Sequence, residues 1–376
     1  MSDKNSAADR AVALTRSDMP SGYEISLDRY VGRHGIGNGF QMDEKRIPKD
    51  FGEIQSMHGF ESEYQNIVDY IVRITHRIWE DRDVEYIADT YSDDSMVFDD
   101  YGLQLGNKKI IADTHHTTHA FSDIQLIADE VIWAGNDKVG YHTSHRTIIR
   151  GTNDGDSKYG AATNRSVDVL VIANCVAKDN KIFLEHVLYN NSALVEQMGF
   201  DINSIVEQML EHKPAGWPRD EQTWKALRSA TSPKAAISNS DPIKGFDPDV
   251  FARTACRTVW EYQDYTKLGD FFHPEISFLG TTDRKAQGFE EYQDSHQNVM
   301  RGVSLEHFSV DEVYWMGNAS EGFLVSTRWS MEAAIDGATV QIWGLSQYQI
   351  VNEKIAKEWT LFNELDLKMQ LAAAQK

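Results

Sequence analysis

Apolar residues recur every three to four positions at the start of two long stretches of the chain. These positions are Ile67, Ile71, Ile74 and Ile78 in the first stretch, and Val250, Ala255 and Val259 in the second. Such a period predicts an amphipathic helix at the start of each stretch. A short second helix, a strand and a third helix after Gly106 or Gly288 are expected to follow, because glycine precedes a polar first turn in both places.

The remainder of each stretch alternates apolar and polar residues. In the first stretch the alternating segments are IQLIADEVIW, KVGYHTSHRTII, SVDVLVIANCVA and KIFLEHVLY. Alternation with a period of two predicts strands, and Gly-Asn, Gly-Thr and Asp-Asn pairs predict the turns between them. Early helices and late strands indicate an α+β domain with helices on one side of a curved antiparallel sheet.

The two stretches also repeat one another in sequence. DEVIWAGN around Trp133 matches DEVYWMGN around Trp315, and NKIFLEHVLYN matches EKIAKEWTLFN. Further matching pairs are Gly140 with Gly322, Ser144 with Ser326, and Arg146 with Arg328. A duplicated order of elements is typical of two similar domains in tandem.

The repeat predicts four segments. Residues 1–60 form an N-terminal extension, 61–199 the first copy, 200–247 a linker with short helices, and 248–376 the second copy. A chain of 376 residues that is 41% hydrophobic can bury the cores of two such domains.

Charge narrows the range of partners. The formal net charge of −21 repels nucleic acid and anionic membranes, so neither is expected as a partner. The first 20 residues lack the pattern of a secretory signal, and no run is apolar enough to span a membrane, which indicates a cytoplasmic protein. Cys175 and Cys256 lie in different copies and predict neither a disulfide framework nor a zinc site.

The element order resembles that of the nuclear transport factor 2-like (cystatin-like) superfamily, in which a cone-shaped sheet encloses a pocket and the helices pack on its concave side. Within that superfamily, GTNDGDSKYGAATNRSV at 151–167 resembles the Gly-Thr-His-x-Gly loop of SnoaL-like polyketide cyclases. KIFLEHVLYNNSALVEQMG resembles their closing strand and tail. The resemblance implies two tandem cone-shaped barrels. The second copy keeps KEWTLFN without the long loop, so it is interpreted as a reduced copy.

Three asparagines depart from that family pattern. Asn153 stands where the cyclases carry a histidine, and Asn190 and Asn363 stand where they carry the aspartate that acts as acid and base. An amide does not exchange a proton near neutral pH. Asn190 and Asn153 are therefore predicted to bind substrate through hydrogen bonds.

The catalytic candidates come from the first copy, which holds seven of the 13 histidines. His186 replaces a tryptophan of the second copy and is predicted to share a pocket face with Asn190, because residues two apart in a strand point the same way. An imidazole exchanges protons near pH 7. His142, His119 and Asp99 are the predicted assisting groups.

Four further residues of the first copy are predicted to contact substrate. Arg146 offers a planar fork for a carboxylate or enolate, with an ion pair to Glu185 on a neighbouring strand as the alternative. Tyr86, Trp79 and Tyr141 are predicted to form apolar pocket walls.

These predictions lead to one main hypothesis about function and two alternatives. The main one is a small-molecule enzyme of SnoaL-like type, without a cofactor, that moves protons next to a carbonyl in the pocket of the first copy during isomerisation, cyclisation, hydration or elimination. The first alternative is a non-catalytic small-molecule-binding protein.

The second alternative is a metal-dependent lyase or oxygenase in which His115 and His119 join Asp99 or Asp100. No metal ligand is assigned in the main hypothesis. The expected partner is a small organic substrate. The two copies are predicted to pair as an internal pseudo-dimer, and further homo-oligomerisation is left open.

Overall fold

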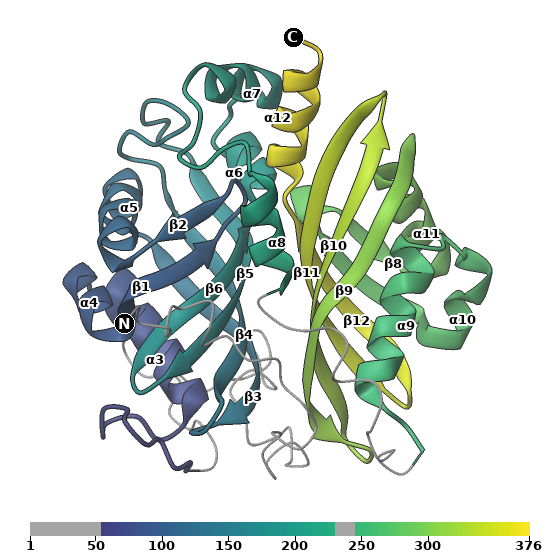
Figure 1. The fold of residues 1–376 in the computed structure, drawn as a ribbon, viewed down its shortest axis with the longest axis horizontal. Coiled ribbons are helices and arrows are strands. Elements are labelled where there is room, and N and C mark those ends of the chain that lie inside the picture. Colours follow the sequence, from purple (N-terminus) through teal and green to yellow (C-terminus); the bar gives the residue numbers. More distant parts are fainter. Residues whose placement is uncertain (1–53, 230–244) are drawn as a thin grey trace.

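A computed structural model describes residues 54–229 and 245–376 of the chain, in two halves with a six-stranded sheet each (Figure 1). Most of the predicted extension and part of the predicted linker therefore lie outside the described residues. The elements of the first half are α3 (Ile67–Trp79), η4 (Val84–Tyr86), α4 (Ile87–Thr90), β1 (Tyr91–Phe98), β2 (Leu103–Leu105), α5 (Asn107–Ala120), β3 (Gln125–Asn136), β4 (Gly140–Thr152), β5 (Ser166–Lys178) and β6 (Lys181–Tyr189).

Three helices follow the first sheet, and the second half then repeats the order of the first. The three helices are α6 (Asn191–Gln197), α7 (Ile202–Glu211) and α8 (Glu221–Ser229). The elements of the second half are α9 (Pro248–Trp260), η5 (Tyr265–Lys267), α10 (Leu268–Phe271), β7 (Phe272–Gly280), η6 (Thr281–Asp283), β8 (Lys285–Gln287), α11 (Gly288–Val299), β9 (Val303–Asn318), β10 (Gly322–Ile335), β11 (Ala338–Val351), β12 (Lys354–Phe362) and α12 (Glu364–Ala374). The domain boundaries at residues 61, 199 and 248 remain a prediction from the sequence.

Both sheets have the same strand order, β2-β1-β6-β5-β4-β3 and β8-β7-β12-β11-β10-β9. The α+β fold class is confirmed. The sheets are not wholly antiparallel, however, because β1 pairs with β6 in parallel and β7 pairs with β12 in parallel. The prediction missed this because sequence alternation fixes which face a side chain takes but not the direction of the neighbouring strand.

Helix α3 shows why the predicted apolar stripe forms a helix. Its first turn is capped by the Asn66 side chain, which accepts a hydrogen bond from the backbone amide of Asp69. Ile67, Ile71 and Ile74 are buried against the sheet. The second predicted apolar stripe, on α9, is less completely buried, since Val250 is 42% exposed.

The repeated Trp-x-Gly-Asn segment forms the β3–β4 hairpin in the first half and the β9–β10 hairpin in the second. Gly135 has a φ of 102° and Gly317 a φ of 113°, a region that favours glycine. A Cβ on Gly135 would lie 2.0 Å from the carbonyl oxygen of Gly140. The repeat is thus explained by a turn that only glycine fits.

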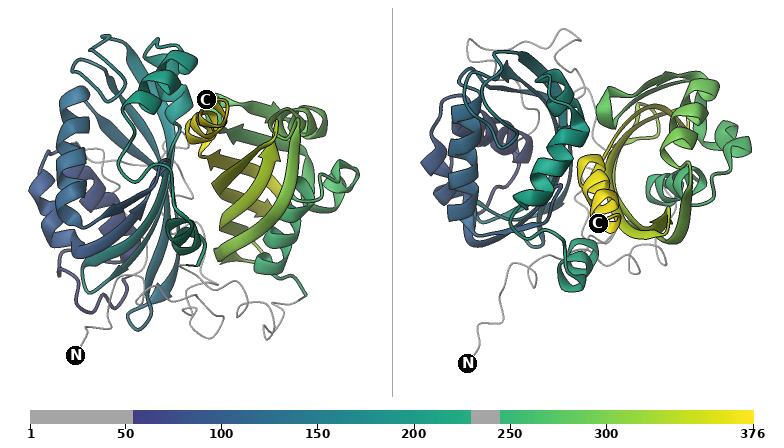
Figure 2. Two further views of the ribbon diagram at one scale, coloured as in Figure 1. Left: turned by 45° about the horizontal axis from the view of Figure 1, so that its top comes forward. Right: turned by 90° about the horizontal axis from the view of Figure 1, so that it is seen from above.

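The two halves meet through the sheet faces that point away from α3, α5, α9 and α11, and α12 also lies between the halves (Figure 2). Gln347 Nε2 donates to Ser144 Oγ at 2.8 Å, and Asn174 Nδ2 donates to Ser326 Oγ at 3.2 Å. Ser144 and Asn174 are direct neighbours on adjacent strands of the first sheet. Ser326 and Gln347 are direct neighbours at the equivalent place in the second sheet. The same contact therefore occurs twice with the roles of the halves exchanged, as in a pseudo-twofold pair.

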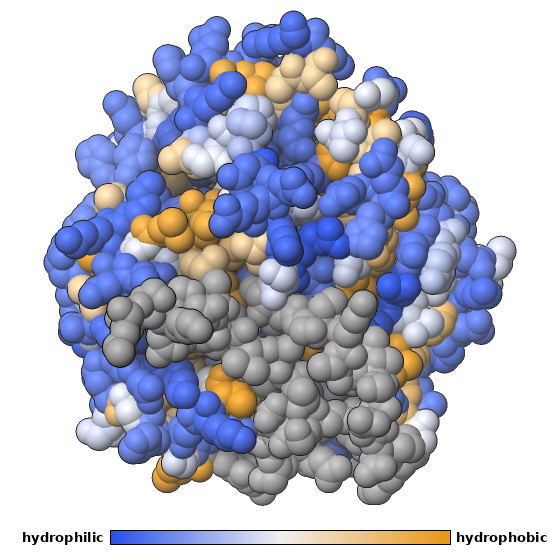
Figure 3. Space-filling view, in the orientation of Figure 1, coloured by the Kyte–Doolittle hydropathy of each residue, from blue (hydrophilic) through white to orange (hydrophobic). Residues whose placement is uncertain are grey.

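Among the residues coloured in Figure 3, hydrophilic ones cover most of the visible surface, with smaller apolar patches between them. Among the helices of the described residues, none combines the length and apolar character that crossing a membrane requires.

Candidate functional site

The leading catalytic candidate, His186, lies between the two sheets. It is 2% exposed, its ring stacks on Phe98 with the centroids 4.9 Å apart, and its Nε2 lies 3.1 Å from the carbonyl oxygen of Leu227. Burial holds the pKa of His186 well below its usual value, and the nearby charge of Arg328 lowers it further. The ring is therefore neutral near pH 7.

The predicted position of His186 in a concave pocket is wrong, and the reason is local. Strand β6 ends at Tyr189, and Asn190 stands just before the following helix with a backbone that is not extended, so strand alternation cannot be counted back from Asn190. Glu185 points toward the helices of its own half, where it accepts a hydrogen bond from Tyr91. His186 points the opposite way. A catalytic role for His186 stays untested.

The other three catalytic candidates are dispersed. His142 is buried between the sheets, with Nδ1 3.0 Å from Oε1 of Glu312. His119 is exposed on α5. The Asp99 carboxylate accepts hydrogen bonds from two backbone amides of the following turn at 2.8 and 2.9 Å. The structure therefore does not bring these groups together around one pocket.

The histidines of α5 form no metal-ligand set with their neighbours. His115 and His119 are both exposed, and His115 Nε2 lies 3.2 Å from Oε1 of Glu85. Across residues 54–229 and 245–376, no three side chains of the His, Cys, Asp and Glu types gather in an arrangement that could hold a metal ion. The metal-dependent alternative gains no support from these residues.

Both asparagines predicted to bind substrate are fully buried and hydrogen-bonded within the protein. Asn153 holds its own loop, since its Nδ2 donates to the carbonyl of Gly155 at 2.8 Å and its Oδ1 accepts from the amide of Thr163 at 3.0 Å. Asn190 binds the turn at 281–283 in the other half. Neither amide is directed into a first-half pocket.

Arg146 is placed in the interface between the halves. Its Nε donates to Asp129 at 2.6 Å, it hydrogen-bonds Gln347, and its guanidinium carbon lies 3.6 Å from the ring centre of Trp359. The ion pair is therefore with Asp129 on β3, and the predicted alternative partner, Glu185, is wrong. Glu185 lies on the opposite face of the sheet.

The three predicted wall residues belong to the core of the first half. Tyr86 is hydrogen-bonded to the hydroxyl of Tyr64 at 2.8 Å, and Tyr141 donates to the carbonyl of Ser56 at 2.7 Å. Trp79 is partly buried against the same core. A substrate-binding role for these residues stays untested.

One carboxyl group in each half does face the concave side. Tyr91 donates to Glu185 at 3.0 Å in the first half, and Tyr292 donates to Glu358 at 2.6 Å in the second. Burial raises the pKa of Glu185 and the pKa of Glu358 to about 7, although hydrogen bonds to the carboxylates oppose the rise. Both groups can therefore exchange a proton at neutral pH.

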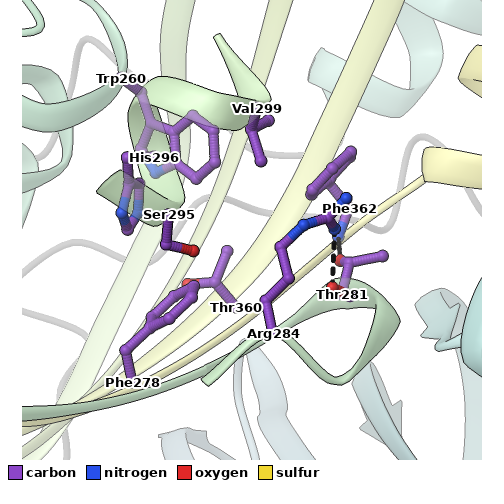
Figure 4. Close-up of a pocket in the computed structure, with 9 residues that line it drawn as sticks. All are labelled: Trp260, Phe278, Thr281, Arg284, Ser295, His296, Val299, Thr360 and Phe362. Atoms are coloured by element: carbon purple, nitrogen blue, oxygen red, sulfur yellow. Dashed lines mark hydrogen bonds between the residues drawn. The ribbon is translucent and has the colours of Figure 1, made fainter. Parts of the chain in front are cut away.

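A small pocket lies beside one of these carboxyl groups, on the concave side of the second sheet, and Figure 4 shows its lining residues. Its free volume is about 10 Å³, roughly enough for one water molecule. It is lined by Trp260, Phe278, Thr281, Arg284, Ser295, His296, Val299, Thr360 and Phe362. Thr360 joins the pocket to the carboxyl group, because its hydroxyl lies 2.6 Å from Oε1 of Glu358. The pocket thus combines aromatic walls with a few polar groups, as small-molecule sites do.

His296 is the one histidine that lines this pocket. Its Nδ1 lies 2.9 Å from the carbonyl oxygen of Tyr292, which can only accept, so Nδ1 carries the proton and Nε2 the lone pair. Nε2 is buried and, in the part of the chain that the structure describes, has no hydrogen-bond partner. Burial lowers the pKa of His296 to about 4, so the lone pair is available at neutral pH.

The charge of Arg284 at the pocket is already balanced. Its two terminal nitrogens lie 2.7 and 3.0 Å from the carboxylate oxygens of Glu364, and one of them also donates to the carbonyl of Thr281 at 2.7 Å. The pocket therefore does not offer a free cation to an anionic ligand.

Sequence reasoning missed Glu358 and His296 for different reasons. The glutamate was visible as the acidic position that NKIFLEHVLYN and EKIAKEWTLFN share. His296 is an isolated histidine in QDSHQN, whereas the first copy holds seven histidines. Its spacing of four from Tyr292, one helical turn, was the available signal.

Comparison with known families settles what the second half is. Residues 251–371 match the family described as SnoaL-like polyketide cyclase. This part of the chain is a SnoaL-like domain. The match falls on the second copy, which is predicted from the sequence to be the reduced one. This domain contains the pocket, His296 and Glu358.

Solved structures resemble parts of the chain at low identity. A "Putative SnoaL-like polyketide cyclase" from Jannaschia Sp. CCS1 is 12% identical over 34% of this chain and 91% of that chain, with a TM-score of 0.30. An M.tuberculosis LEH-like epoxide hydrolase is 13% identical over 34% of this chain and 92% of that chain, with a TM-score of 0.27. No curated protein sequence matches the chain.

Proposed function

We propose that the SnoaL-like domain is a small-molecule enzyme that transfers a proton next to a carbonyl group, with His296 as the base. The observation that supports this most is the buried Nε2 of His296, which lines a pocket and keeps its lone pair free at neutral pH. A base with a pKa near 4 is adequate for such chemistry when the site stabilises the resulting oxyanion.

Thr360 and Glu358 are proposed to stabilise that oxyanion. When Glu358 is protonated, its proton is donated to the Thr360 hydroxyl. With Ser346 Oγ, 2.7 Å away, also donating to Thr360, that hydroxyl can donate its own proton to a carbonyl oxygen in the pocket. When Glu358 is ionised, Thr360 donates to the carboxylate instead. Because the pKa of Glu358 is about 7, both states are populated near neutral pH. Thr360 contacts the ligand, and Glu358 acts through it.

The proposal moves the working pocket from the first copy, where the sequence predicted it, to the second. The pocket has free space for only about one water molecule, so a ketone enters it only when the side chains that line it move apart, and the rings of Trp260 and Phe362 favour a planar ligand. Small cyclic ketones therefore serve as probes in place of the unidentified substrate.

The test measures proton exchange directly. The full chain is incubated in D₂O with cyclohex-2-enone or cyclohexanone, and loss of the protons next to the carbonyl is followed by NMR. We expect exchange above the rate without protein, and a loss of at least about 100-fold in His296→Gln, because glutamine can accept a hydrogen bond but cannot take the proton.

The matched control is His116→Gln, which alters an exposed histidine on α5, the helix that corresponds to α11 in the other half. It should keep the wild-type exchange rate. Full exchange in His296→Gln, or binding of the probes without exchange, would overturn the proposal. The second outcome favours the non-catalytic binding protein.

A further inference from the structure

The turn η6 forms part of the pocket wall in the second half and has a strained backbone. Thr281 and Arg284, at its two ends, both line the pocket. Between them Thr282 has a φ of 58° and Asp283 a φ of 52°. Two successive residues other than glycine adopt this left-handed region only when their surroundings hold them there.

The contacts that hold the middle of this turn come largely from the first half. Asn190 Oδ1 accepts a hydrogen bond from the amide of Thr282 at 2.7 Å, and Asn190 Nδ2 donates to Asp283 Oδ1 at 3.0 Å. Gln197 Nε2 donates to Asp283 Oδ2 at 2.9 Å. Asn190 is fully buried, so it cannot turn to water instead.

Only an amide satisfies both partners at position 190. The amide of Thr282 requires an acceptor, and the carboxylate of Asp283 requires a donor, so the orientation of the Asn190 side chain is fixed by its neighbours. An aspartate at this position would put two carboxylates about 3 Å apart in a partly buried site, where like charges repel.

The corresponding residue of the second half, Asn363, makes a different set of contacts. Its Oδ1 accepts from the amide of Trp343 at 2.9 Å, and its Nδ2 donates to Asp366 at 2.6 Å. Both partners belong to its own half. The contact of Asn190 with a turn of the other half is therefore not repeated by the pseudo-symmetry.

We infer that Asn190 is a positioning residue for the pocket of the SnoaL-like domain, so that the first half completes the site of the second. This inference rests on the proposed function of that pocket. Asn190 does not touch the ligand; it holds η6 so that Thr281 and Arg284 keep their places in the pocket wall. Gln197 supports the same turn from the first half.

Exchanging the amide and the carboxylate tests the inference. In Asn190→Asp, backbone hydrogen exchange measured by mass spectrometry should become at least tenfold faster at residues 281–284. The KM for the ketone probe should rise severalfold with a smaller change in kcat. Combining Asn190→Asp with Asp283→Asn restores one donor and one acceptor, so both quantities should return close to wild type.

If Asn190→Asp fails to fold, backbone hydrogen exchange at 281–284 and KM are measured in Gln197→Ala instead, since Gln197 lies nearer the surface. Gln208→Ala, on the adjacent helix α7, is its matched control, because the Gln208 amide contacts the carbonyl of Lys158 and not the turn. It should leave exchange at 281–284 and KM unchanged.

The outcomes separate this inference from the proposed function. Unchanged backbone exchange at 281–284 in Asn190→Asp and Gln197→Ala would overturn the inference. Faster backbone exchange with KM and kcat unchanged would also overturn it, and would leave the result for His296→Gln standing. If the wild-type chain exchanges no ketone protons, the proposed function fails while backbone exchange still reports whether Asn190 holds the turn.

Discussion

At the scale of single residues, each half buries one glutamate against a tyrosine. Glu185 and Glu358 occupy equivalent positions in the closing strands, are 9% and 1% exposed, and have a pKa raised to about 7 by burial. Only Glu358 is connected to the described pocket, through Thr360. Glu358 thus takes part in the proposed chemistry. Glu185 does not, so the effect of its buried carboxyl group on stability can be measured separately.

Glu185→Gln should make the stability of the protein less dependent on pH. A carboxyl whose pKa is higher in the folded than in the unfolded protein stabilises the fold at low pH, and this stabilisation is lost as the pH rises through its folded pKa of about 7. Wild type should therefore lose about 2 kcal/mol more than the variant between pH 5 and pH 8. Urea unfolding at both pH values measures the difference, and an exposed Glu211→Gln serves as control. Equal pH dependence in wild type and Glu185→Gln would contradict the raised pKa.

At the scale of elements, sequence pattern predicted which segments form strands and helices but not always which way their side chains point. Segments such as KIFLEHVLY coincide with β6, because alternation with a period of two is a property of the strand itself. The side that faces the pocket was inferred from Asn190, one residue beyond the strand, and the inferred face was wrong. His142 is predicted as an assisting catalytic group, and no sequence signal shows that its partner, Glu312, lies in the other half.

The repeated hairpin turn allows a prediction at this scale. Gly135→Ala should lower the free energy of unfolding by about 2–4 kcal/mol, because alanine disfavours a φ of 102° and its Cβ would meet the Gly140 carbonyl oxygen at 2.0 Å. Gly269→Ala is the matched control: beyond its chain neighbours and its own helix backbone no atom lies within 4 Å of its Cβ position, and the residue lies in helix α10, so stability should rise by up to about 1 kcal/mol and not fall. Thermal and urea unfolding measure both, and a similar small effect in the two variants would refute the role of the turn.

At the scale of the whole molecule, duplication was readable from the sequence and the interface between the copies was not. The shared Ser-x-Arg strand was recognised as common to both, and the structure gives its reason: Ser144 and Arg146 both contact the opposite sheet. Ser144 and Gln347, for example, are 203 positions apart in the sequence, so no local sequence pattern predicts such contacts. The face-to-face packing agrees with the internal pairing expected from the repeat.

Arg146 provides the test of how strongly this interface joins the halves. Arg146→Met removes the hydrogen bond to Gln347 and the contact with the Trp359 ring, and leaves Asp129 without its arginine. We expect a loss of about 2–3 kcal/mol, because the interface keeps buried polar atoms that have lost their partner. Both halves should remain in one urea transition shifted as a whole, since neither sheet face is suited to water once separated.

Arg150→Met on the same strand is the matched control. Arg150 pairs with Asp168 at 2.6 Å, but the two side chains are 55% and 52% exposed, so the pair is screened by water. Its loss should lower stability by less than about 1 kcal/mol. Tryptophan fluorescence and circular dichroism during urea unfolding report on the two variants together. An equal cost for Arg146→Met and Arg150→Met would mean that Arg146 joins the halves no more strongly than an exposed ion pair stabilises a single sheet.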